Sequence, residues 1–193
     1  MANIKNRKFI SVLFCTLLLI LLLLLSYKMV LFFTDATPAQ KQVFSFLDGK
    51  GELATEFTEL EISHLQDVKK VMKYADYLFY LMLSVVTAMI TIYRKDKVFL
   101  LHLLNYGGKV TIAAVLLVGV SALLSFDQVF AAFHKIFFPQ GNWTFAADSM
   151  LIQTFPLDFF VGISWNVFLL TFFLGILFIV SGYIYGYVLR DRN

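Results

Sequence analysis

Two histidines stand in settings where an imidazole can do chemistry. His134 lies in the apolar run Phe133-His134-Lys135-Ile136-Phe137-Phe138, where a lipid-facing segment would carry only apolar side chains. An ionisable residue at membrane depth is costly, and it marks a candidate functional site. His64 lies between Glu61 and Asp67, each three residues away, so the three side chains share one side of a helix. Because a nearby carboxylate can orient an imidazole and raise its basicity, both histidines are candidates for acid–base chemistry.

Other reactive groups have no recognisable setting. The sequence has no G-x-S-x-G motif, no glycine-rich phosphate loop, no H-E-x-x-H motif and a single cysteine, Cys15. Two histidines without an evident nucleophile suit a reaction in which the substrate brings its own nucleophile. The protein would then supply a general base and stabilise an oxyanion.

Two other interpretations remain open. A metal-binding membrane protein would use His64, His134, Asp67 and Glu61, because imidazole and carboxylate ligands suit zinc or another divalent cation. A non-catalytic assembly or transport subunit would use the aromatic segment around His134 to dock another membrane protein. The spans lack the charged or Gly/Pro-broken stretches that mark a transport path, which weakens this last interpretation.

The composition shows the medium in which these residues work. A hydrophobic content of 60%, 22 phenylalanines and a mean hydropathy of +0.78 exclude a water-soluble domain. Four stretches approach the roughly 20 apolar residues that a membrane-spanning helix needs. They lie at about residues 9–33, 77–93, 110–126 and 161–189. We therefore expect an all-α membrane protein with four transmembrane helices, built as a single integral membrane domain over residues 1–193.

The basic residues predict the orientation of the spans. Nine of the sixteen fall in the segments 1–8, 94–109 and 190–193, which are cytoplasmic by the positive-inside rule. We expect both termini in the cytoplasm, and the segments 34–73 and 127–160 outside, where they form a small extracellular cap. The net charge of +3 then reflects topology and contact with membrane lipid rather than binding of nucleic acid.

Two helices are predicted in the first outward segment. One begins at Thr37-Pro38, an N-cap followed by a proline at the first helical position, and ends near Gly49 or Gly51. The other begins after Thr58, where a glutamate three residues later completes a capping box. Nothing before Tyr93 breaks it, so it would run for about 50 Å and hold the first histidine on a rigid element.

The second outward segment is unusually apolar for an exposed loop. From Val129 to Phe138 nearly every residue is apolar, so we expect this stretch to be buried at the membrane interface. An amphipathic or re-entrant hairpin would fit. Trp143 and Trp165 stand where an aromatic belt would place them. Asp148 precedes a short apolar run, and its simplest role there is that of a helix N-cap.

Taken together, these segments resemble the bacterial lipoprotein intramolecular transacylases. The resemblance rests on the stretches from Glu61 to Lys69, Phe133 to Phe138 and Asp148 to Ile152, together with Trp143 and Phe155-Pro156. It extends over essentially the whole chain, including the order of the motifs between the four spans. It implies two essential histidines between the membrane helices and the cap, at the extracellular face of the bacterial cell membrane.

The resemblance also implies a substrate and a reaction. The substrate is a diacylglyceryl-modified lipoprotein with a free α-amine on its N-terminal cysteine. The sn-2 acyl chain moves from the glyceryl oxygen to that amine and leaves a lyso-form lipoprotein, and we expect no cofactor and no metal. On this basis His64 and His134 are the expected catalytic residues. Residues expected to bind substrate or support the histidines are Glu61, Asp67, Phe133, Phe137, Trp143, Asp148 and Phe155.

The roles of the two histidines can be assigned in two ways. We expect His134 to take the proton of the amine and return it to the departing alkoxide. His64, positioned by Asp67 or Glu61, would then polarise the carbonyl or its oxyanion. The opposite assignment is chemically equivalent at this stage.

Overall fold

The apolar stretches form long helices in the computed structural model, which describes the backbone of residues 4–190 and the side chains of residues 6–184. The long helices are α1 (Ile4–Phe33), α3 (Glu59–Tyr93), α4 (Lys97–Leu124) and α7 (Leu157–Arg190), and the short ones are α2 (Pro38–Leu47), α5 (Phe126–Phe137) and α6 (Met150–Thr154). All four long helices are long and apolar enough to cross a membrane. The predicted all-α architecture with four spans is confirmed.

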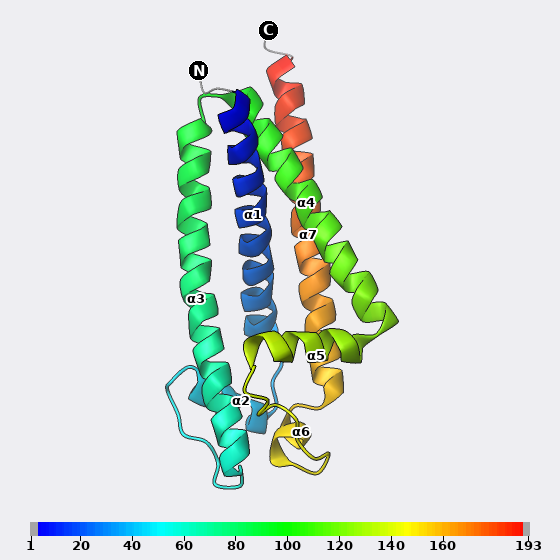
Figure 1. Cartoon of the computed structure of the whole chain (residues 1–193). Helices are drawn as coiled ribbons and strands as arrows, with labels where there is room; N and C mark the ends of the chain where they lie inside the picture. The colour runs from blue at the N-terminus through cyan, green and yellow to red at the C-terminus, as the bar shows by residue number, and fades with distance from the viewer. Residues whose placement is uncertain (1–3, 191–193) are drawn as a thin grey trace.

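The long helices run side by side, and α1 packs against α3, α4 and α7 (Figure 1). The start of α1 and the end of α7 lie at one end of the bundle, and the short helices lie at the other (Figure 1). We call residues 34–73 and 127–160, at this second end, the cap. The chain ends at residues 1–3 and 191–193 lie outside the described residues, so their expected cytoplasmic position stays a prediction.

The helix α4 begins earlier than the sequence suggested. Most of the segment 94–109 was expected to precede the span, but α4 already starts at Lys97. Its glycines do not interrupt it, because they let the helices approach closely. A Cβ at Gly108 would lie 2.6 Å from the backbone oxygen of Gly175 on α7. Close packing of α4 on α7 thus keeps the helix continuous through these glycines, and the predicted bounds of the span stay a prediction.

The helix α3 extends from the bundle into the cap. Its capping box forms as predicted: Thr58 Oγ1 accepts from the backbone N–H of Glu61, and the Glu61 carboxylate accepts from the N–H of Thr58. With 35 residues the helix is about 52 Å long, more than the roughly 30 Å of a hydrocarbon core. Its charged residues all precede Tyr77. The first turns of α3 therefore lie outside the membrane-spanning part.

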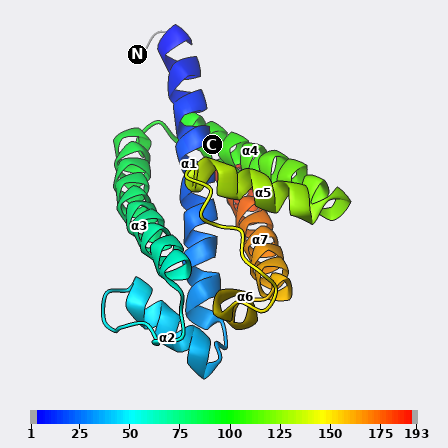
Figure 2. The same ribbon diagram turned by 60° about the horizontal axis from the view of Figure 1, so that its bottom comes forward.

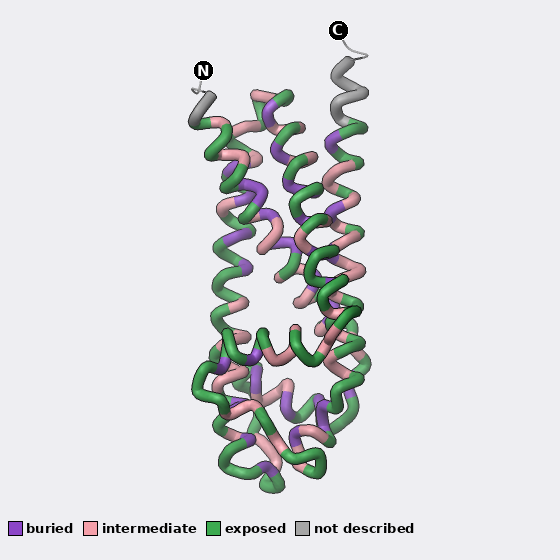
Figure 3. The backbone as a smooth tube through the Cα atoms, turned by 45° about the vertical axis from the view of Figure 1, so that its right-hand side comes forward, coloured by how far each residue is buried: buried purple, intermediate pink, exposed green. Residues whose placement is uncertain are grey.

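The cap has a core of its own. The helix α2 begins after the Thr37 N-cap and ends at Leu47, as predicted, and Gly49 with φ of 77° turns the chain away. Figure 2 shows α2 beside the start of α3, and α6 beside the start of α7. Apolar side chains from these elements form one cluster, namely Val43, Leu47, Phe57, Leu65, Leu151 and Phe155. Burial is concentrated on the facing sides of the long helices and in this cap core (Figure 3).

The apolar stretch at the start of the second outward segment forms one amphipathic helix, α5, and no hairpin of its own. After α5 the chain runs without regular structure until α6, which is only five residues long. The N-cap of α6 is Ser149, whose Oγ accepts from the backbone N–H of Ile152 at 3.3 Å. The expectation that Asp148 caps this helix is wrong by one position, because the hydroxyl of Ser149 already satisfies the free N–H.

Candidate functional site

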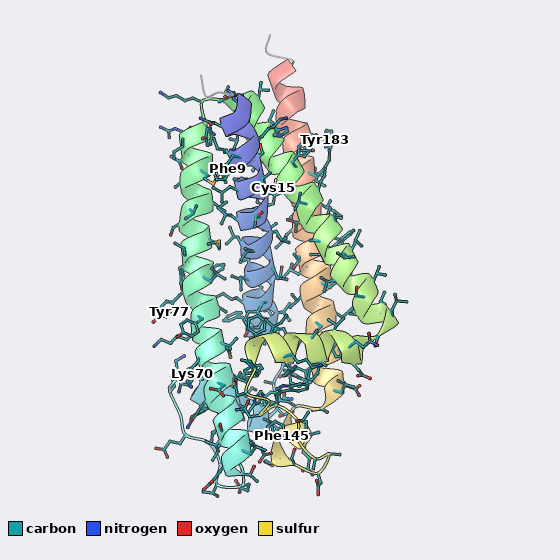
Figure 4. The ribbon with its side chains drawn as sticks, viewed as in Figure 1. Phe9, Cys15, Lys70, Tyr77, Phe145 and Tyr183 are labelled. Carbon is teal, nitrogen blue, oxygen red and sulfur yellow. The ribbon has the colours of Figure 1, made fainter. Side chains whose placement is uncertain are left out.

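The helix α5 lies across the cap end of the bundle (Figures 1 and 2). Figure 4 shows it crossing near the level of Lys70 and Tyr77 of α3, where the uncharged part of that helix begins. One face of α5 exposes Phe133, Ile136 and Phe137, and the opposite face carries polar residues. This pattern is typical of a helix lying in the plane of a membrane boundary.

The structure brings the two histidines together. His64 from α3 and His134 from α5 have ring centroids 6.3 Å apart and planes inclined by 25°. Their residues are only 7% and 8% exposed. The packing of α5 against the first turns of α3 thus creates one site from residues 70 positions apart in the chain.

The proton of neutral His134 has a defined position. Its Nδ1 lies 2.8 Å from the carbonyl oxygen of Phe130, one helical turn earlier. A carbonyl only accepts, so Nδ1 carries the hydrogen and Nε2 keeps its lone pair. Burial lowers the pKa of His134, and this hydrogen bond opposes the shift only in part. At neutral pH the ring is therefore an uncharged base with Nε2 available.

The surroundings of His64 lower its pKa strongly. Burial and the nearby His134 lower its pKa from 6.5 to about 4, and Asn142 and Asp67 act in the opposite direction. Its Nδ1 is buried and has no hydrogen-bond partner among the described residues. His64 is thus also neutral near pH 7, but which of its nitrogens carries the hydrogen is set by its neighbours.

Aromatic side chains enclose both rings. The centroid of His64 is 4.7 Å from that of Phe138 and 5.5 Å from that of Phe145, which Figure 4 places in the cap. The centroid of His134 is 4.0 Å from that of Phe130 and 5.0 Å from that of Trp143. Trp143 was among the site residues predicted from the sequence, and Phe130, Phe138 and Phe145 were not. Phe130 is four residues before His134, so helical spacing alone places it on the same side of α5.

Asp67 acts on His64 through its charge and makes no hydrogen bond to it among the described residues. Its carboxylate accepts hydrogen bonds from Gln140 Nε2 at 2.6 Å, Asn142 Nδ2 at 3.0 Å and Lys70 Nζ at 2.9 Å. The hydrogen bonds from Lys70, Asn142 and Gln140 hold its pKa below the usual value. Asp67 therefore fastens the chain after α5 to α3, and it faces no imidazole directly in the described part of the chain.

Glu61 has a different neighbourhood from the one expected. It is 1% exposed, and one carboxylate oxygen accepts from the backbone N–H of Leu151 at 2.7 Å. The other accepts from the N–H and the hydroxyl of Thr58. Burial alone would raise its pKa, but these hydrogen bonds together hold it below the usual value. Glu61 joins the start of α3 to α6, and no hydrogen bond to His64 is found among the described residues.

The other residues predicted for the site differ in how close they lie to the two histidine rings. Phe133 packs edge-on against His134, with centroids 5.4 Å apart, and also contacts Phe137. Phe155 belongs to the cap core, where it packs on neighbouring phenylalanines. Asp148 is exposed. Neither Phe155 nor Asp148 is brought to the histidine rings.

The two carboxylates proposed as metal ligands point away from the histidine pair. Among the side chains of residues 6–184, no group of three or more histidine, cysteine, aspartate or glutamate side chains converges. Glu61 faces Thr58 and Leu151, and Asp67 is engaged by amides and a lysine. The metal-binding interpretation therefore loses the four-residue cluster on which it depended.

An open groove of about 620 Å³ lies elsewhere, between α1 and α7. Its walls include Val30, Phe33, Ile163 and Asn166, and neither histidine lines it. Chemistry at the histidines therefore does not take place in this groove.

The part of the chain that holds the histidines and the cap is similar in sequence to known proteins. Residues 35–160, which include both histidines, match the family model described as "Lipoprotein intramolecular transacylase Lit". A curated Aquifex aeolicus protein described as uncharacterized is 25% identical over 126 residues, which is 65% of this chain and 56% of that protein. The match thus spans little more than half of that relative.

Solved structures show the same fold. The membrane integral lipoprotein intramolecular transacylase Lit from Bacillus cereus superimposes with a TM-score of 0.83 at 18% identity, covering 98% of this chain and 99% of that one. A variant of the same protein gives a TM-score of 0.81 at 17% identity, covering 98% of this chain and 96% of the other. The long helices and the cap are therefore a shared architecture.

Proposed function

The chain belongs to the lipoprotein intramolecular transacylase family, and we propose that it moves an acyl chain within a membrane-anchored lipoprotein. The acyl chain leaves the sn-2 glyceryl oxygen of the substrate and joins the α-amino nitrogen of its N-terminal cysteine, giving a lyso-form lipoprotein. The observation that carries the proposal is the buried pair of imidazoles, with centroids 6.3 Å apart, inside an aromatic enclosure. Such a pair supplies proton transfer to a substrate that contains both its nucleophile and its ester.

The first requirement of this reaction is a folded substrate. When the amine attacks the ester, the ring that closes contains the nitrogen, two cysteine carbons, the sulfur, two glyceryl carbons, the ester oxygen and the carbonyl carbon. Closing such a ring costs conformational entropy unless the substrate is held in place. The rings of Phe138, Phe145 and Trp143 around the histidines provide the confining walls.

The second requirement is movement of one proton. A carbon–nitrogen bond forms as the carbon–oxygen bond breaks, and the proton leaves nitrogen and ends on the glyceryl oxygen. His134 suits this transfer because its Nδ1–H is fixed by the carbonyl of Phe130, which leaves Nε2 as the base. The protonated ring then returns the proton to the departing oxygen. The total mass of the lipoprotein does not change.

The contribution of His64 depends on its tautomer. With hydrogen on Nε2 it would polarise the ester carbonyl, as expected from the sequence. With hydrogen on Nδ1 it would accept a hydrogen bond from the amine. Both roles use the same neutral ring, whose pKa burial lowers to about 4.

The membrane position of the site suits a lipid ester. In this proposal α5 rests at the outer boundary, with Phe133 and Ile136 toward the hydrocarbon, so that His134 is level with glyceryl esters. The substrate then reaches the histidines without leaving the membrane. The chain ends face the cytoplasm, and membrane lipids surround the bundle.

Substitution of each histidine tests the proposal. We expect His64→Ala and His134→Ala to lose at least about 100-fold in formation of the lyso-form, since general acid–base catalysis contributes on the order of 10²–10⁴-fold. The matched control is His102→Ala, because His102 packs on Phe99 and Tyr106 near the start of α4, which lies at the end of the bundle opposite the cap (Figure 1). Mass spectrometry of a lipoprotein N-terminal peptide measures the product, and membrane extraction confirms insertion. Near-normal lyso-form from an inserted His134→Ala variant would refute the assignment.

A further inference from the structure

Two buried polar atoms in the site lack hydrogen-bond partners among the described residues. They are Nδ1 of His64 and Oδ1 of Asn142. An unpaired buried polar atom is costly, so each calls for an explanation. Asn142 lies beside His64, because its Nδ2 is 3.3 Å from Oγ of the adjacent Ser63 and 3.0 Å from Oδ2 of Asp67, one turn further along α3. Asn142 also acts to raise the pKa of His64.

The orientation of the Asn142 amide is fixed from its other side. Its Nδ2 donates to Asp67 Oδ2 at 3.0 Å and contacts Ser63 Oγ at 3.3 Å. An ionised carboxylate can only accept, so the NH₂ group must face Asp67. The reversed amide would set two oxygens against each other. Oδ1 of Asn142 is therefore an acceptor turned away from Asp67.

We propose that Asn142 is a positioning residue that holds the hydrogen of neutral His64 on Nδ1. An amide oxygen accepts and cannot donate, so a hydrogen bond between these two atoms requires Nδ1–H. Nε2 of His64 then carries a lone pair, as Nε2 of His134 does. The pocket thus presents two acceptors from two different elements.

Two acceptor nitrogens match the two N–H bonds of a primary amine. This role of His64 and His134 rests on the proposed transacylation. A neutral primary amine has two N–H bonds and one lone pair. When both N–H groups donate to Nε2 atoms, the lone pair has a fixed direction toward the ester carbon. His64 then orients the amine, in place of polarising the carbonyl, and the two rings can exchange the role of base.

The tautomer can be measured independently of activity. Nitrogen NMR of protein labelled at its histidines distinguishes Nδ1–H from Nε2–H, with the His64 signal assigned by comparison with His64→Ala. At neutral pH we expect Nδ1–H for His64 in the unsubstituted protein. Asn142→Leu removes the acceptor at similar size, and it should shift the ring toward Nε2–H. Transfer should fall on the order of 100-fold, as for a misplaced reactant.

Two matched variants separate this role from general damage. Gln140→Leu removes another donor to the same Asp67 oxygen and should leave the His64 tautomer unchanged. Asn142→Gln keeps an amide that can donate to Asp67 and still offer an oxygen to Nδ1, so it should retain Nδ1–H.

The possible results separate this inference from the proposed function. Nε2–H in the unsubstituted protein, or an unchanged tautomer in a folded Asn142→Leu variant, would overturn the role of Asn142 even if transfer proceeds. Absence of acyl transfer with Nδ1–H observed would refute the proposed function alone. Should Asn142→Leu fail to fold, the signals of the unsubstituted protein and of Asn142→Gln still decide the tautomer.

Discussion

The two histidines are similarly buried but held in different ways. His134 bonds to a carbonyl of its own helix, so its ring position follows from α5 alone. His64 depends on a residue of the chain segment after α5, which is fastened by Asp67. Burial lowers the pKa of both rings, so that both are in the neutral form that accepts a proton.

This environment predicts an unusual pH dependence of the transfer rate. Only the neutral amine attacks, so the rate should first fall below the α-amine pKa near 8. Protonation of an imidazole should cause a second fall in the rate at lower pH. The pKa of His64 is lowered from 6.5 to about 4, and that of His134 is also lowered. The second fall should therefore lie below pH 6.5. Initial rates of acyl transfer measured across the acid range check the prediction. A second fall centred at pH 6.5 or higher would contradict it.

The sequence identified the reacting groups better than their neighbours. His134 stood out because an imidazole is rare in such apolar surroundings, and His64 stood out because Glu61 and Asp67 flank it at helical spacing. Asn142 carried no such signal, since an asparagine in a Pro-Gln-Gly-Asn turn is ordinary turn chemistry. Its importance arises only when the turn folds back on Asp67, a contact across 75 positions. Glu61 was expected beside His64 from helical spacing, but capping and a contact with α6 determine where it points.

The link between α3 and α6 makes a prediction about stability. Glu61→Gln removes the charge that accepts three hydrogen bonds, so it should lower the free energy of unfolding by about 1.5–3 kcal/mol. The folded-state pKa of Glu61 is lowered, so its contribution is present above the usual pKa of 4.5 and disappears as the pH falls through the lowered value. Thermal unfolding of purified protein measures both effects.

The matched control for this prediction is Glu59→Gln. Glu59 lies in the same first turn of α3 but is exposed, so its replacement should change the stability by less than about 0.5 kcal/mol. Equal unfolding temperatures for the two variants would show that Glu61 does not join the helices.

Helix starts in the cap were predictable because their signals are local. Thr37-Pro38 and the Thr58 capping box act over a single turn, and both formed as expected. The start of α4 also has a local signal, because the side chain of Asp96 accepts from the backbone N–H of Phe99. Local signals do not predict that this helix continues through two adjacent glycines. Gly107 and Gly108 are helix-weakening residues by local propensity, yet close packing on α1 and α7 favours them there. Tertiary contacts likewise decide that α5 lies across the bundle instead of forming a hairpin.

The molecule as a whole has a predicted direction in the membrane. We expect the cap outside and the turn between α3 and α4 in the cytoplasm, because basic residues concentrate at that end. In a Cys15→Ser background, Lys50→Cys in the cap should react with a membrane-impermeant thiol reagent in intact cells. Lys95→Cys, exposed at the opposite end, should react only after permeabilisation. The reverse labelling pattern would invert the topology and place the histidines at the inner face.

Transfer within one lipoprotein molecule is the central claim, and a labelled substrate tests it most directly. Purified protein would be given a diacylglyceryl lipopeptide with an isotope-labelled sn-2 chain, in a membrane of unlabelled lipids, and fragment-ion mass spectrometry would locate the label. The account predicts that the label moves completely from the glyceryl ester to the α-amide while the total mass stays constant. An unlabelled chain on the nitrogen, or any gain or loss of an acyl mass, would contradict it.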